Sequence, residues 1–546
     1  MRLEDGSDPE TDTSRELGPP EFTHEFLHGL RLLLVTGGLT LVMFLGMMDI
    51  SIIATAIPQI TSDFHRLEHV GWYIGVYSLC SAALQPLSGK VFTYFSTKWS
   101  FLSFFFIFEV GSCISGAAVS SEMLIGGRAI AGLGYSGVTN GALTIIASAI
   151  APPKRPCMFF PRDGCANRTL TVSQIGMILG PILGGVFTEF VSWRWCFYIN
   201  LPLGAFTAVC LVFIDIPDQV RKEPVSFELV RRLLPRFDLV GFALFAPAAV
   251  MGLLALQFGA STYGWSSPVV IGLFCGCAGA AALFVAWEHR MKDDAMMPFD
   301  VIRRTAVWSC SINFSGIMSL AVVAGNYMPI YFQSVRGLSP AMSGVYMLVS
   351  TASNILFILI SGALMTRFRY PMPWSMASGA LGAVACGLMS TWAPGSTLAA
   401  VFGYQVLNGA RGLGMQQPIL VVQHVLPAGK IAVGNSLMVF FSNSATAVMV
   451  TIGNVIFQES LVAELAARAP SVSPAAAIAA GGSAEAVRAL AIASGADVES
   501  LLLAYSLSVN RVFYLLAGIC VVVFVSAFGI GWVDLGHKDK KDEEKV

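Results

Sequence analysis

The chain has 546 residues, of which 55% are hydrophobic and only 12% are charged, and its mean hydropathy is +0.69. Soluble domains carry about 25% charged residues, so a globular core cannot hide this much apolar surface and the solvent must be lipid. The net charge of −1 gives no reason to expect nucleic acid as a partner, and eleven scattered cysteines imply no disulfide framework.

Fourteen apolar runs are long enough to cross a bilayer, which takes about 20 residues in a helix. They cover residues 30–57, 70–91, 99–118, 123–150, 171–189, 195–214, 239–257, 268–287, 307–332, 342–366, 373–392, 398–426, 433–457 and 513–533. The sequence therefore predicts an all-α polytopic membrane protein with fourteen transmembrane helices. The first run follows no basic segment, so we expect it to remain in the chain as a signal anchor.

Lysine and arginine residues in the loops orient these spans, because such residues gather on the cytosolic side of membranes. With the N-terminus inside, the cytosolic loops hold eighteen of them and the opposite loops hold six. Both termini are therefore predicted to be cytosolic, residues 1–29 as a disordered tail and residues 534–546 as a short charged tail. Residues 458–510 are predicted to form an extracellular loop with an amphipathic helix rather than a fifteenth span.

An internal repeat relates the two parts of the chain. The sequence AGLG at 131–134 matches RGLG at 411–414, and both lie in spans that run inward and end in a basic turn. Repeats of the same direction are typical of transporters built from two bundles. We therefore expect a six-helix bundle at 30–214, a linker with two extra helices at 215–306, and a second six-helix bundle at 307–533.

Four motifs in the first bundle carry a family resemblance. They are MDISIIATAIP (48–58), GRAIAGLGYSG (127–137), GMILGPILGG (176–185) and WRWCFYINLPLG (193–204). Together they resemble the major facilitator superfamily, in its fourteen-helix drug:proton antiporter branch, and especially fungal toxin and multidrug efflux pumps. The resemblance implies the major facilitator fold, with two six-helix bundles and two extra central helices.

One motif departs from that pattern. The loop after the second span reads GKVFTYFSTK (89–98), where the family has G-x-L-a-D-r-x-G-r-K. Gly89 and Lys98 are retained, but Thr93 stands at the position of the acid. The charge network that the resemblance implies on the cytosolic side must be weakened or replaced.

Charged residues inside spans are costly and usually functional or paired, and Asp49, Glu109 and Arg128 are of this kind. At 1.5 Å per residue, Asp49 lies about 13 Å and Arg128 about 8 Å from the outer ends of their spans. This shared depth suggests that Arg128 tunes Asp49 while Asp49 exchanges a proton, with a static structural pair as the alternative. Glu109 is a second proton site, a site for cationic substrates, or a structural hydrogen-bond partner.

The fifth span, which contains IGMILGPILGGVF (175–187), is unusual in its glycines. Gly176, Gly180 and Gly184 recur every four residues and form a ridge that lets another helix approach closely. Pro181 removes a helical hydrogen bond and bends the span, and Gly185 adjoins the ridge. The resemblance implies a gating helix whose ridge packs against the other half and prevents proton leak.

In the second half, Arg411 has no acidic residue in any span to neutralise it. It either pairs with backbone carbonyls or attracts an anionic or carbonyl-rich substrate. The nearby amides of Asn408, Gln416 and Gln417 serve as interhelical hydrogen bonds or line a cavity. We predict a substrate cavity that includes these four residues.

The predicted function is proton-coupled efflux of small lipophilic compounds, such as a fungal secondary metabolite, toxin or drug, by alternating access. The alternatives are a siderophore or basic amino-acid transporter of the same superfamily, and a non-transporting membrane sensor. No phosphate-binding loop, zinc motif or nucleophile elbow is present, so we expect no enzyme activity, cofactor or metal. The expected partners are a small-molecule substrate, protons and the lipid bilayer, and the chain is expected to be a monomer in the plasma membrane rather than the vacuolar membrane.

The segment CMFFPRDGCANRTL (157–170) is longer and more charged than the resemblance predicts. We therefore expect the fifth span to begin near Thr171. The segment is either a genuine cytosolic insertion or an error in the gene model.

Overall fold

The structure is a computed structural model. It describes residues 27, 29–64, 70–149, 166–216, 238–261, 263–291, 299–365, 367–427, 430–480 and 484–535, and a few positions between 218 and 232. The predicted tails and most of the segment 157–170 lie outside the described residues. Every regular element in the described part of the chain is a helix, which agrees with the predicted all-α class.

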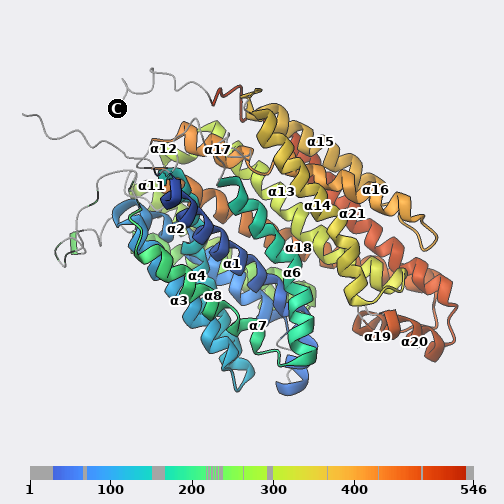
Figure 1. The fold of residues 1–546 in the computed structure, drawn as a ribbon. Helices are drawn as coiled ribbons and strands as arrows, with labels where there is room; N and C mark the ends of the chain where they lie inside the picture. Colours follow the sequence, from blue (N-terminus) through green and yellow to red (C-terminus); the bar gives the residue numbers. More distant parts are fainter. Residues whose placement is uncertain are drawn as a thin grey trace, which may run out of the picture.

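The first half forms one bundle, coloured blue to green in Figure 1. Its helices are α1 (Gly29–Phe64), α2 (Val70–Tyr94), α3 (Thr97–Gly116), α4 (Ser121–Ala149), α6 (Ala166–Phe190), α7 (Trp195–Tyr198) and α8 (Asn200–Val212). The most extensive helix packing is between α1 and α6, and between α4 and both α2 and α3. Val42, Phe101 and Phe108 are among the buried side chains of its core.

The second half forms another bundle, yellow to red in Figure 1. Its elements are α13 (Thr305–Ile330) with the π-helical turn η4 (Tyr331–Val335), α14 (Pro340–Met365), α15 (Pro371–Met389), α16 (Leu398–Asn408), the 3-10 helix η5 (Gly409–Leu413), α17 (Gln417–Val425), α18 (Ile431–Arg468), α19 (Pro474–Ala480), α20 (Ala484–Ser494) and α21 (Val498–Phe528). Its core contains Tyr331, Trp392 and Phe513.

Eleven helices of the described residues are long and apolar enough to cross a membrane. They are α1, α3, α4, the α7–α8 pair, α10 (Leu239–Ser261), α11 (Pro268–Met291), α13 with η4, α14, α15, α18 and α21. Three further segments, α2, α6 and the broken α16–η5–α17, pack within the two bundles. The chain is therefore a polytopic membrane protein.

The two helices between the bundles lie at the edge of the molecule. α10 contacts α2 in one half and α18 in the other, and α11 packs mainly on α10. Asp238, just before α10, accepts hydrogen bonds from the N–H of Gly241 at 2.9 Å and from Trp287 Nε1 at 2.6 Å. Burial raises the pKa of Asp238, but hydrogen bonds, together with the charge of Lys90, outweigh burial and hold that pKa below its usual value. Asp238 is therefore an ionised anchor between α10, α11 and α2.

Two predicted boundaries differ from the structure. α18 extends to Arg468 and α21 begins at Val498, so the segment between them is shorter than the predicted loop 458–510. Within it, α19 and α20 have seven and eleven residues, too few to cross a bilayer. Buried residues such as Val487 fix this segment on the bundle. The fifth span begins at Ala166 rather than near Thr171.

We call the end of the bundle that carries the α2–α3 connection, α12 (Phe299–Ile302) and α17 the basic end. Lys90, Lys98 and Arg304 lie there. α19 and α20 lie at the opposite end (Figure 1). The charged residues inside the bundles lie between these two ends.

Candidate functional site

Asp49 and Arg128 form an ion pair inside the first bundle. Nη1 of Arg128 on α4 lies 2.5 Å from Oδ2 of Asp49 on α1. The two residues are 1% and 0% exposed, so water does not screen the pair. The shared depth expected from the sequence is confirmed by this contact.

The glycines after Arg128 explain why α4 can bring the guanidinium so close. A Cβ at Gly132 would lie 2.3 Å from the backbone oxygen of Tyr77 on α2, and a Cβ at Gly134 would lie 2.3 Å from the backbone nitrogen of Phe108 on α3. Only glycine permits both approaches. Arg128 then donates from Nε to the backbone oxygen of Tyr73 at 3.3 Å, and its Cζ lies 4.4 Å from the ring centre of Tyr77. A cation over an aromatic face is stabilised by the ring quadrupole.

The ion pair extends into a polar network that sequence reasoning missed. Asn200 Nδ2 donates to Oδ1 of Asp49 and to Oγ of Ser112, both at 3.2 Å. Asn200 belongs to the motif WRWCFYINLPLG, which was the available signal, although the sequence alone assigned it no partner. Trp193 of the same motif donates to Asp63 at 2.8 Å and ties α7 to the end of α1.

Glu109 lies one helical turn before Ser112 on α3. A Cβ at Gly204 of α8 would lie 2.1 Å from its Oε1, so the missing side chain at Gly204 makes room for the carboxyl group. Both carboxyl oxygens are buried and have no hydrogen-bond partner among the described residues. Unpaired carboxylates are expensive in an apolar interior, so this group favours the protonated, neutral form.

The glycine ridge of α6 packs within the first half. A Cβ at Gly176 would lie 2.5 Å from the backbone oxygen of Phe44, and one at Gly180 would lie 2.0 Å from Oγ of Ser51, both on α1. The expectation that these glycines face the other half is wrong, because they pack against α1, which makes the most extensive contact with α6. α6 also contacts α14 of the second half, where Cγ1 of Ile182 lies 3.9 Å from the position of a Cβ at Gly344.

Gly185, at the outer end of that motif, has no such close contact. Gly184 is buried, whereas a Cβ at Gly185 would have no atom within 4 Å. Pro181 lies within the continuous helix α6. The motif therefore combines two glycines about one helical turn apart, which pack tightly against α1, with a looser position at Gly185.

The second half differs at the equivalent span, because its helix is broken. α16 ends at Asn408, η5 winds as a 3-10 helix, and α17 starts only at Gln417. Arg411 lies in this break, is 9% exposed, and donates from Nη1 to Oγ of Ser350 at 3.3 Å and to the backbone oxygen of Asn408 at 3.4 Å. Interrupted helices are typical of binding sites in transporters.

The four predicted cavity residues all lie at this break. Asn408, Gln416 and Gln417 are buried. Neither side-chain oxygen nor nitrogen of Asn408 has a hydrogen-bond partner in the described part of the chain, and Oε1 of Gln417 also has none. Nε2 of Gln417 donates to the backbone oxygen of Leu413 at 3.1 Å. The break therefore gathers a cation and unsatisfied amides.

The structure supports the internal repeat. A Cβ at Gly412 would lie 2.4 Å from the backbone oxygen of Asn354 on α14, as one at Gly132 would lie 2.3 Å from that of Tyr77 on α2. The aligned glycines thus face the second helix of their own bundle in both halves. This correspondence is independent of the four-residue sequence match.

At the basic end, the segment after α8 replaces the acid that is missing at Thr93. The N–H of Thr97, which begins α3, donates to Oδ1 of Asp218 at 2.8 Å. Nζ of Lys98 donates to the backbone oxygen of Val212 at 2.8 Å and lies 3.7 Å from Asp215. We call this set of contacts, with Lys222, the basic-end clasp.

Lys222 completes the clasp from the other side. Its Nζ donates to the backbone oxygens of Phe92 and Thr93 near the end of α2. Burial lowers the pKa of Lys222, and the carboxylate of Asp218 opposes this effect. A cation at carbonyl groups that end a helix is favourable for the helix dipole.

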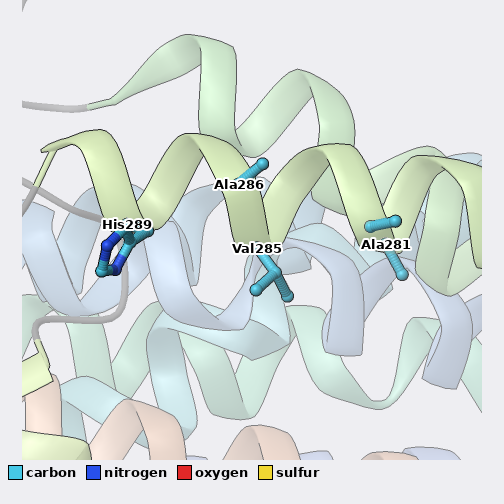
Figure 2. A pocket seen from close by; sticks show the side chains of 5 residues that line it. Ala281, Val285, Ala286 and His289 are labelled. Atoms are coloured by element: carbon cyan, nitrogen blue, oxygen red, sulfur yellow. The ribbon is translucent and has the colours of Figure 1, made fainter.

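A hollow of about 690 Å³ lies along α11. Its lining comes from one helix, with Ala281, Val285, Ala286 and His289 shown in Figure 2. Neighbouring side chains such as Leu283 are exposed and apolar. This surface fits lipid acyl chains and does not mark the functional site. Among the described residues, no group of three or more His, Cys, Asp or Glu side chains is placed to hold a metal ion.

Two repeated helical bundles in a membrane, with a buried ion pair in one and a broken helix in the other, define a transporter. A sequence profile described as Major Facilitator Superfamily matches residues 39–450, and the chain belongs to this family. It is a multi-pass membrane transporter and not an enzyme.

Relatives match along nearly the whole chain. The MFS-type transporter calB of Penicillium decumbens is 46% identical over 96% of this chain and 92% of its own length. The efflux pump mokI of Monascus pilosus is 44% identical over 93% of both chains, and the efflux pump mlcE of Penicillium citrinum is 42% identical over 95% of this chain and 93% of its own.

A solved structure shares the fold. The human organic anion transporter MFSD10 (TETRAN) superposes with a TM-score of 0.53 and covers 92% of this chain and 100% of its own. At 12% sequence identity, the likeness concerns the fold alone.

Proposed function

We propose that this protein is a proton-coupled efflux pump for small lipophilic compounds, such as fungal secondary metabolites, and that it works by alternating access. The family membership and the relatives named efflux pumps support export. The observation that carries proton coupling is the buried pair of Asp49 and Arg128. No nucleotide-binding motif supplies another energy source.

The topology in this proposal has fourteen spans. Eleven are the membrane-length helices, and α2, α6 and the broken α16–η5–α17 are the other three. The lysines and arginines of the basic end support a cytosolic position for that end, with both termini on that side. Small-molecule cargo, protons and lipid are the partners, and the plasma membrane is the favoured location for an exporter.

Proton coupling in this scheme resides in the first bundle. The carboxylate of Asp49 is held by Arg128 and Asn200 in the present arrangement. Protonation of Asp49 removes the charge that attracts Arg128, so the guanidinium loses its anionic partner and is held by the contacts it already makes with the backbone oxygen of Tyr73 and the ring of Tyr77. Glu109, buried one turn from Ser112, is the second proton site.

Contacts between the bundles support a structure closed at the basic end. A Cβ at Gly89 on α2 would lie 2.3 Å from Oγ of Ser436 on α18. With its amide oriented to satisfy both groups, Asn140 accepts from the N–H of Gly89 at 3.1 Å and donates to the backbone oxygen of Ala432 at 3.2 Å. A contact between the two bundles at this end is suited to alternating access.

Asp49→Asn tests the proposal. The amide is close in size but cannot carry the exchanged proton, so proton-driven uptake of a lipophilic probe into inside-out vesicles should fall to the level of vesicles without the protein. The probes are dansyl-undecanoic acid and its methyl ester, followed by fluorescence over a range of external pH. Glu464→Gln, at an exposed helix pair with Arg468, is the matched control and should behave as the wild type.

An Asp49→Asn variant that transports either probe with an unchanged pH dependence would refute proton coupling through Asp49. If wild-type inside-out vesicles with an acidic interior accumulate neither probe, the result would count against efflux of lipophilic cargo. Inward movement of the probes in whole cells would favour an importer of the same superfamily.

A further inference from the structure

Arg411 is a buried cation whose hydrogen bonds use little of its capacity. A guanidinium has five N–H donors, but both of its hydrogen bonds in the structure come from Nη1, at 3.3 Å to Ser350 and 3.4 Å to the backbone oxygen of Asn408. Both acceptors are neutral. No carboxylate of the described residues pairs with Arg411.

In the first half the buried arginine has the carboxylate partner that Arg411 lacks among the described residues. Arg128 contacts Tyr73 on the second helix of its bundle, and Arg411 contacts Ser350 at the corresponding place on α14. Tyr73 and Ser350 each lie four residues before the residue that faces the aligned glycine. In the first half Asp49 completes the arrangement at 2.5 Å. The second half has the cation without its carboxylate.

Such a cation is costly to keep in a membrane protein unless a partner neutralises it for part of the cycle. We infer that Arg411 binds an acidic group, a carboxylate, on the exported compound, which thereby takes in the second half the place that Asp49 has in the first. This inference rests on the proposed efflux function and names the class of its cargo: lipophilic carboxylic acids in their ionised form.

The surroundings of Arg411 fit a carboxylate. The side-chain amide of Asn408 is buried and unpartnered, so its N–H groups are available as further donors. The break in the helix also puts the N-terminus of α17, a nine-residue helix, within six residues of Arg411, and the positive end of a helix dipole favours anions. Arg411 retains 9% exposure, unlike Arg128 with 1%. A cationic cargo group would be repelled here.

Binding of a matched pair of probes tests the inference. The full-length protein in nanodiscs is titrated with dansyl-undecanoic acid and with its methyl ester, which differ only in the charge of one end. We expect the acid to bind the wild type more tightly than the ester, by about tenfold or more. Arg411→Gln should bind both probes equally, and Arg411→Lys, which keeps a point charge but loses the planar fork, should keep part of the preference.

Asn408→Asp is the sharper variant. It places a carboxylate one turn from the guanidinium, so it satisfies Arg411 internally and should remain folded while it loses the preference for the acid. Arg336→Gln is the control for the loss of an arginine, since Arg336 binds the backbone oxygen of Ser396 at 2.6 Å near the other end of the bundle. It should keep the wild-type preference.

The inference is overturned if Asn408→Asp or Arg411→Gln retains the preference for the acid, or if the wild type binds the ester as tightly as the acid. Transport separates this failure from that of the proposed function. Proton-driven uptake of the ester without preference for the acid would leave efflux standing and remove the carboxylate site. Selective binding of the acid without proton-driven uptake would leave the site standing and remove the coupling.

Discussion

In the described part of the chain each bundle holds one buried arginine, and the surroundings of the two differ. Arg128 is 1% exposed and meets a carboxylate, a backbone oxygen and an aromatic ring. Arg411 is 9% exposed and, among the described residues, its side chain donates to two neutral oxygens, at 3.3 Å and 3.4 Å. In the proposed mechanism the repeated scaffold separates two tasks: an internal ion pair for protons in one half, and an open cation for cargo in the other.

The backbone explains how one scaffold supports both. α4 is a continuous helix of 29 residues, so Arg128 is fixed against α1 and α2. In the equivalent segment of the second half, α16 ends at Asn408 and α17 begins at Gln417. The second residue of α17 is Pro418, and proline has no backbone N–H to donate a helical hydrogen bond. The interruption leaves Arg411 among unsatisfied amides instead of beside an acid.

The largest expected effect is the difference in stability between the variant that removes the guanidinium of Arg128 and the variant that removes that of Arg411. Arg128→Gln leaves Asp49 as a buried charge without its partner, and this should destabilise the protein by about 3–5 kcal/mol. Arg411→Gln removes a cation that has no carboxylate partner among the described residues, so the change in stability should be within about 1 kcal/mol. The midpoint of thermal unfolding of the purified protein, measured for both variants, checks this difference.

The double variant Asp49→Asn with Arg128→Gln is the control for that comparison. It removes both charges, so most of the lost stability should return even though transport does not. Equal losses for the two single variants would show that Arg411 has a structural partner of the same strength as Asp49, and the contrast between the halves would fall.

The next effect tests whether the scaffold itself is equivalent. Gly132→Ala and Gly412→Ala each push a methyl group against a backbone oxygen, at 2.3 Å and 2.4 Å. Both should destabilise by about 1–3 kcal/mol, because a packed backbone cannot give way. Gly126→Ala on α4 and Gly403→Ala on α16 add a methyl group with no atom within 4 Å, and they should be neutral or slightly stabilising. A large loss of stability at only one of Gly132 and Gly412 would contradict the structural equivalence of the two halves.

Much of this arrangement could be predicted from the sequence, because it depends on local pattern. Apolar runs reveal helices of membrane length, and the rise per residue was enough to bring Asp49 and Arg128 to one depth. The repeated GLG motif identified equivalent spans. These signals work because lipid forces every spanning segment into a helix with satisfied backbone groups.

Other parts depend on side-chain contacts between distant segments. Nothing in the local pattern pairs Asn200 with Asp49 or places Gly204 under Glu109. The ridge of Gly176 and Gly180 shows that a helix can approach closely, but a ridge does not say which helix, and the partner is α1. The break at Gly409–Leu413 was also missed, since glycine and proline are tolerated in continuous membrane helices.

The smallest expected effect concerns how the first bundle closes its basic end. Ser96 makes no side-chain hydrogen bond to the start of α3, and Asp218 binds the N–H of Thr97 instead. Asp218→Ala should therefore cost about 1 kcal/mol, the usual value of a lost helix cap. Asp215→Ala is the matched control, because that carboxylate is fully exposed, 3.7 Å from Lys98, and exposed pairs contribute little. In the second bundle α15 begins with Pro371 after a residue that makes no side-chain cap, so it has no capping bond of this kind to lose. A Tm that falls for Asp218→Ala and not for Asp215→Ala would show that the basic-end clasp acts through the helix cap, and equal changes would assign it to net charge, which salt would then screen.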